Sequence, residues 1–61
     1  MQVDQLALEL AIVRTEGLLH MLRRAKEAQG YGRIAVVNDT LREADGRLQE
    51  IAVQIQDMRG R

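Results

Sequence analysis

The sequence contains no cysteine, proline, tryptophan or phenylalanine, and Tyr31 is its only aromatic residue. The absence of cysteine excludes a disulfide, and a single histidine, His20, without any thiol makes a structural zinc site unexpected. A chain shorter than about 70–80 residues usually needs a disulfide, a metal, very good helix packing or a partner subunit to stay folded. At 61 residues, this chain therefore depends on helix packing and association, and we expect no metal and no cofactor.

Charges of the two signs balance, since 9 Lys and Arg residues oppose 9 Asp and Glu residues. The longest purely apolar runs, such as residues 10–13, are far shorter than the about 20 residues that span a membrane. The first residues include Asp4 and no basic residue, which is unlike a secretory signal. We therefore expect no membrane segment and a cytoplasmic location.

A glycine-rich break, Gly30-Tyr31-Gly32, divides the chain into two arms of similar length. Glycine is favoured just past a helix end, and basic residues in the preceding turns complement the helix dipole. Two equal arms around a short loop are typical of an αα-hairpin. We predict an all-α fold with a single domain over 1–61, in which helix 1 spans about 2–29, the turn 30–32 and helix 2 about 33–59.

The second arm carries apolar residues at alternating spacings of three and four, which is a heptad pattern typical of an amphipathic helix. This predicted seam against the first helix comprises Ile34, Val37, Leu41, Ala44, Leu48, Ile51, Ile55 and Met58. An alternative is a helix-strand-helix fold, since residues 34–37 are β-branched apart from one alanine and Thr40 to Glu43 has capping-box spacing. A strand over 33–38 would have to pair with another chain. The unbroken heptad phase favours a continuous helix.

The first arm carries two apolar seams instead of one. The seam expected to face the second helix comprises Leu8, Ala11, Thr15, Leu18, Leu22 and Ala25, with Ile12 and Leu19 on its flank. The other seam comprises Val3, Leu6, Leu10, Val13, Gly17 and Met21. A single partner helix covers only one seam, and an open apolar row is unusual for a soluble monomer. We therefore expect this second seam to be a self-association or partner interface, most simply in a C2 dimer that forms a four-helix bundle. Gly17 within it either permits a close helix crossing or is merely tolerated.

The sequence offers no set of residues for catalysis. It has neither Cys nor Ser, and neither threonine has a base and an orienting group at suitable spacing. Glu16 and His20 stand four apart, a pair that is more typical of a solvated helix face than of a site. Gly30-Tyr31-Gly32 lacks the Lys-Ser/Thr that follows in a phosphate-binding loop. We predict that the protein is not an enzyme.

A protein-interaction role remains. We expect a self-associating helical hairpin that binds and regulates or chaperones a partner protein, as an adaptor or an inhibitor. A possible exposed contact patch at the turn comprises Arg23, Arg24, Tyr31 and Arg33, because Tyr and Arg are enriched at binding hot spots. The alternative is an RNA- or DNA-binding helical bundle that uses this basic turn end. Few basic residues and one aromatic argue against the alternative.

Overall fold

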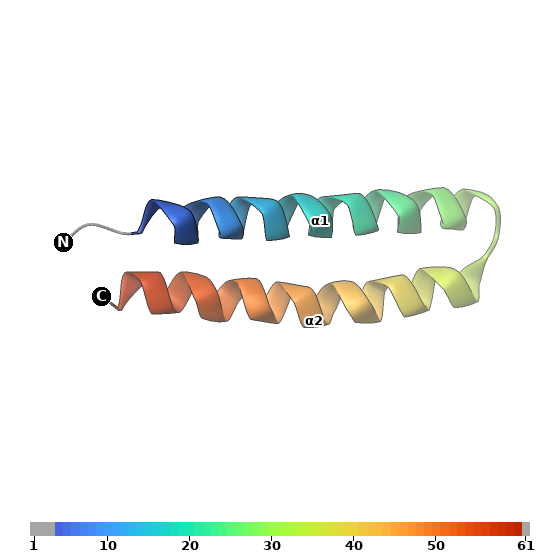
Figure 1. Cartoon of the computed structure of the whole chain (residues 1–61). Helices are drawn as coiled ribbons and strands as arrows, with labels where there is room; N and C mark the ends of the chain where they lie inside the picture. Colours follow the sequence, from blue (N-terminus) through green and yellow to red (C-terminus); the bar gives the residue numbers. More distant parts are fainter. Residues whose placement is uncertain (1–3, 61) are drawn as a thin grey trace.

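The computed structural model describes residues 4–60, which form two antiparallel α-helices joined by a short turn (Figure 1). Helix α1 spans Gln5–Gly30 and helix α2 spans Ile34–Arg59, with 26 residues each. The two helices lie side by side along a molecule that measures 48 × 15 × 10 Å. The predicted all-α hairpin is confirmed. We call the end of the hairpin opposite the turn its open end.

The start of α1 is fixed by Asp4, which has extended backbone angles and acts as the N-cap. Its carboxylate accepts a hydrogen bond from the Leu6 backbone N–H at 3.0 Å. This bond satisfies one of the amide groups that a helix leaves unpaired in its first turn. The described helix therefore begins at Gln5, later than the expected start at about residue 2; positions 2 and 3 lie outside the described residues.

Replacing Asp4 with alanine should lower the free energy of unfolding by about 1 kcal/mol, the usual cost of a lost N-cap. Asp4→Ser retains a capping oxygen and should unfold close to the wild type. Chemical denaturation followed by circular dichroism measures both. Equal loss in the two variants would show that the cap does not stabilise α1.

The turn comprises residues 31–33, one position later than predicted. The amides of Tyr31 and Arg33 donate to the Ala28 carbonyl at 3.1 and 3.0 Å, and the Gly32 amide donates to the Gln29 carbonyl at 3.0 Å. Gly32 has a φ of 71°, a conformation that glycine adopts without steric cost. The chain then enters α2 directly, with the Val37 amide donating to the Arg33 carbonyl at 3.1 Å.

The alternative fold with a strand over 33–38 is wrong, since residues 34–38 form the first turns of α2. Val37 is half-buried in this segment, and its side chain continues the apolar stripe of the rest of α2. Helical packing against α1 therefore outweighs the β propensity of the branched residues.

Alanine is the most frequent residue in the contact line between the helices. Among residues 4–60, the buried residues are Ala25, Ala28, Ala44 and Ile51. The half-buried residues are Ala7, Ala11, Leu18, Met21, Val37, Thr40, Gln54 and Met58. Alanine at these positions lets the helices approach closely, and the larger apolar residues beside them remain at the flanks of the contact.

The observed contact line consequently differs in phase from the predicted seams. In α2, Val37, Ala44, Ile51 and Met58 face α1, whereas Ile34, Leu41, Leu48 and Ile55 are exposed. In α1, Ala11, Leu18 and Ala25 face α2, whereas Leu8, Thr15 and Leu22 are exposed. Thus every second predicted seam position lies beside the contact line instead of within it. The contact line takes its other positions from a neighbouring stripe that includes Met21, Thr40 and Gln54.

Gln54 is a polar residue within the contact line, and it bridges the helices. Its amide nitrogen donates to the Ala7 carbonyl at 3.0 Å, and its amide oxygen accepts from the Arg14 guanidinium at 2.8 Å. A single hydrogen-bonded polar residue in a helical seam specifies register, because other registers leave it unpaired. Gln54 therefore fixes how α1 and α2 align along their length.

The hairpin exposes more surface than a compact chain of its mass. Its accessible surface is 5217 Å², whereas a compact 6.9 kDa monomer exposes about 4,000 Å². Its radius of gyration is 14.3 Å, against about 10.5 Å for a compact domain of this length. Two helices alone do not close a core, so much of the apolar surface stays open.

Candidate interaction surface

One side of the hairpin presents exposed apolar residues from both helices, and we call it the apolar face. It comprises Leu8, Ile12, Thr15, Leu19 and Leu22 of α1 with Ile34, Leu41, Leu48 and Ile55 of α2. Exposure of its large apolar side chains ranges from 43% for Ile55 to 58% for Ile12. Half-exposed Leu and Ile in such a continuous row are typical of an interaction surface.

Heptad spacing explains why these residues share a side. Leu8, Thr15 and Leu22 recur every seven residues in α1, as do the four apolar residues of α2, and each of them precedes a contact-line position by three residues. In two antiparallel helices such positions lie on the same side of the pair. The face is therefore a consequence of the heptad pattern in both helices.

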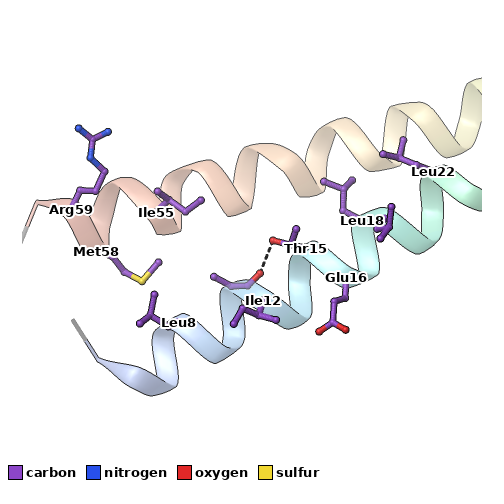
Figure 2. Close-up of a pocket in the computed structure, with 11 residues that line it drawn as sticks. Leu8, Ile12, Thr15, Glu16, Leu18, Leu22, Ile55, Met58 and Arg59 are labelled. Atoms are coloured by element: carbon purple, nitrogen blue, oxygen red, sulfur yellow. Dashed lines mark hydrogen bonds between the residues drawn. The ribbon is translucent and has the colours of Figure 1, made fainter. Parts of the chain in front are cut away.

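Toward the open end, the apolar face is hollowed into an open groove of about 750 Å³ (Figure 2). Its lining comes from both helices and includes Leu8, Ile12, Leu18, Leu22, Ile55 and Met58. The Thr15 hydroxyl within it already donates to the Ala11 carbonyl at 2.7 Å. Figure 2 shows Glu16 and Arg59 at its borders pointing outward. The groove thus offers contact to apolar side chains and has few polar groups for orienting a small molecule.

The predicted interface seam of α1 lies on the other side of the contact line. Leu6, Leu10 and Val13 are exposed there and form a short apolar row, which we call the second row. Together with Asp4, Glu9 and Gln54, they line a shallow hollow of about 490 Å³. The remaining predicted members are dispersed: Met21 is half-buried near Thr40 and Arg47, and Val3 lies outside the described residues. Among the residues that line this hollow, α2 supplies Gln54, so the apolar residues come from α1 alone.

Gly17 is open in the hairpin, since a Cβ placed on it meets nothing within 4 Å. The same holds for Gly46 in α2. Both positions lie in helix interiors, where alanine is favoured over glycine by about 1 kcal/mol.

We predict that Gly17→Ala and Gly46→Ala each raise the free energy of unfolding by about 1 kcal/mol. Thermal unfolding of the two variants compares the two helices directly. A gain at Gly46 with a loss at Gly17 would show that the α1 glycine sits in a close helix crossing, and would contradict the open space found around Gly17.

The contact patch predicted at the turn is only partly assembled. Tyr31 is largely exposed, and the Arg33 guanidinium lies 5.9 Å from the centre of its ring, within cation–π range. Arg23 and Arg24 line different hollows on the two sides of Tyr31, and Glu27 lines both. The carboxylate of Glu27 reduces the positive potential of this end. The turn therefore lacks a continuous basic surface for phosphate groups.

Over residues 4–60, no group of three or more His, Asp or Glu side chains is placed to hold a metal ion. Neither α1 nor α2, over its described residues, contains an apolar window with few enough charges to cross a bilayer. Comparison with protein-family models, curated proteins and solved structures finds no match. The function is therefore inferred from the surfaces of the hairpin itself.

Proposed function

We propose that this protein is a non-enzymatic interaction module that self-associates through its apolar face, so that two hairpins form a four-helix bundle. The observation that carries the proposal is the direction of the apolar stripes. In each helix, one half of the predicted seam packs within the hairpin and the other half lies on the apolar face. The centre of each apolar stripe therefore points midway between the neighbouring helix and the apolar face. In a four-helix bundle, the central axis of the bundle lies in this direction from each helix.

The surface areas agree with this proposal. The accessible surface exceeds that of a compact monomer by about 1,200 Å². A stable protein interface buries about 800 Å² per partner. Each leucine or isoleucine of the face is about half exposed in the hairpin, so burying the rest contributes about 0.8–1.5 kcal/mol. Association can therefore supply the stability that a contact line rich in alanine does not.

The second row is the surface we assign to a heterologous partner. Self-association through the apolar face leaves Leu6, Leu10 and Val13 open on the far flank of α1. An apolar row along one helix is suited to pack against an amphipathic helix of another protein. In this arrangement the bundle acts as an adaptor or an inhibitor, with one such row on each hairpin.

Concentration dependence of unfolding tests self-association. For a folded state that exists only as a dimer, raising the protein concentration from about 1 to 100 µM should stabilise the fold by about 2.7 kcal/mol. Circular dichroism melts across this range should show a rising Tm. A transition that does not change with concentration would contradict the proposal.

Leu10→Glu tests the second row separately. We expect the variant to keep the oligomeric state of the wild type, because Leu10 lies outside the apolar face, and to lose proteins that the wild type retains in affinity capture. Val53→Glu, at an exposed α2 position that lines neither the groove of the apolar face nor the hollow at the second row, is the matched control. Dissociation of the dimer by Leu10→Glu would instead place the second row in the self-association interface.

A further inference from the structure

We infer that the second copy on the apolar face lies with its turn at the opposite end, so that α1 packs antiparallel against α1 of the other hairpin. This inference rests on the self-association proposed above and specifies its geometry. The alternative dimer has both turns at one end and packs α1 against α2 of the other hairpin. Both are closed C2 arrangements with antiparallel neighbours.

The register within the hairpin sets the layers of the apolar face. One hollow brings Gly17, Met21 and Arg24 of α1 next to Thr40, Glu43 and Arg47 of α2. The two helices also begin and end level with each other, since the turn joins Gly30 to Ile34.

This alignment places three pairs at matching heights: Leu8 with Ile55, Thr15 with Leu48, and Leu22 with Leu41. The layers are seven residues apart, which is about 10.5 Å along a helix. They are symmetric about the Thr15–Leu48 layer, so a second copy can match them in either arrangement.

The outer border of the face distinguishes the two arrangements. Along α1 this border carries Ile12 and Leu19, both about half exposed, between the polar residues Gln5 and Lys26 at its ends. The corresponding positions of α2 are Asn38, Asp45, Ala52 and Arg59. α1 thus has a wide apolar strip, and α2 has a narrow strip with a largely polar border.

Turns at the same end would place the wide strip of α1 against the polar border of α2. By height, Leu19 would lie beside Asp45 of the second copy and Ile12 beside Ala52, so that a leucine would cover a carboxylate that accepts a hydrogen bond from the Gln49 side chain at 3.4 Å. When the turns lie at opposite ends, Ile12 of each copy lies beside Leu19 of the other copy. Asp45 then stays at the solvent-exposed border of the α2 pair. The apolar strips are therefore buried most fully when each helix meets its own counterpart.

Thr15 suits the centre of this dimer. The twofold axis passes between the two copies of the middle layer, where Thr15 of one hairpin meets Thr15 of the other. Its hydroxyl donates to the Ala11 carbonyl at 2.7 Å, so burial leaves no unpaired donor. The arrangement also sets the two Tyr31-containing turns at opposite ends of a rod about as long as the hairpin, which is 48 Å.

Single-cysteine variants test the geometry without interference, because the wild type has no cysteine. Thr15→Cys and Leu48→Cys are prepared separately, mixed in unfolded form, refolded and oxidised, and the disulfide-linked species are identified by mass. A disulfide requires Cα atoms about 4.4–6.8 Å apart. Diagonal helices in a four-helix bundle are about 12–14 Å apart, so only facing positions are linked.

We expect linked dimers of Thr15→Cys with itself and of Leu48→Cys with itself, and few mixed dimers. Predominant mixed dimers would overturn the inference and establish turns at the same end. Refolded protein that sediments as a dimer but forms neither self-linked species would also overturn it. Sedimentation of unoxidised Thr15→Cys and of the wild type as folded monomers would overturn the proposed self-association itself.

Discussion

Leu48→Glu is expected to convert the associated protein into a largely unfolded monomer. Leu48 belongs to the middle layer of the apolar face and is 51% exposed in the hairpin. Because each Leu48 is already half-buried in the hairpin, burying the rest in the dimer contributes about 0.8–1.5 kcal/mol per leucine. Loss of both leucines weakens association by about 10–10²-fold, and the two carboxylates placed inside the bundle weaken it further. Because the hairpin has little core of its own, helicity should fall together with association.

Sedimentation equilibrium and circular dichroism at one protein concentration measure both effects of Leu48→Glu. The matched control is Val53→Glu, which also introduces a carboxylate in α2 but at a residue that is 65% exposed and lies outside the apolar face. The control should remain associated and helical. If both variants stay associated, the apolar face does not carry the interface.

Ala44→Leu is expected to destabilise the hairpin although it adds apolar surface. Ala44 is 4% exposed and lies at the point where α1 and α2 approach closely. Additional methylene groups in a filled contact force the helices apart or distort rotamers, at a cost of typically about 1–3 kcal/mol. For a chain of this size, each kcal/mol lowers Tm by about 4–8 °C.

Ala35→Leu is the control for this prediction, since Ala35 is exposed in the same helix. Leucine is nearly as good a helix former as alanine, so its Tm should remain close to that of the wild type. An unchanged or raised Tm in Ala44→Leu would show that the alanine contact line has room for larger side chains.

The sequence allowed the hairpin to be predicted because its signals are local. The glycine-rich turn and the heptad repeat of α2 act over short stretches, and both elements were found close to their expected positions. The ends shifted by a few residues, since the Asp4 carboxylate and the Gly32 conformation decide them. An apolar period locates a helix along the chain, but it does not show which hydrogen bond ends the helix.

The phase of the helix contact could not be predicted in the same way. An apolar period identifies the buried side of a helix but not how that side is divided between two neighbours. The heptad seam of α2 predicts contact with one helix, whereas only four of its eight residues, Val37, Ala44, Ile51 and Met58, meet α1. The preference of the closest contact for alanine, and the polar Gln54 within it, are properties of the packed pair.

The candidate surface changed for the same reason. The second apolar seam of α1 suggested the interface because it was unmatched in the sequence. In the structure, the larger open surface draws on both helices and includes residues that the heptad pattern predicts in the hairpin interior. The number of apolar stripes in the sequence predicts that one hairpin leaves apolar surface open. The position of that surface follows only from the three-dimensional arrangement of the helices.

The most direct test of this account is the mass of the folded wild-type protein in solution. Sedimentation equilibrium at micromolar concentration should give twice the 6.9 kDa mass of one chain, with helicity matching the two long helices. A monomeric mass together with full helicity would contradict the account, because the hairpin would then be stable with its apolar face open.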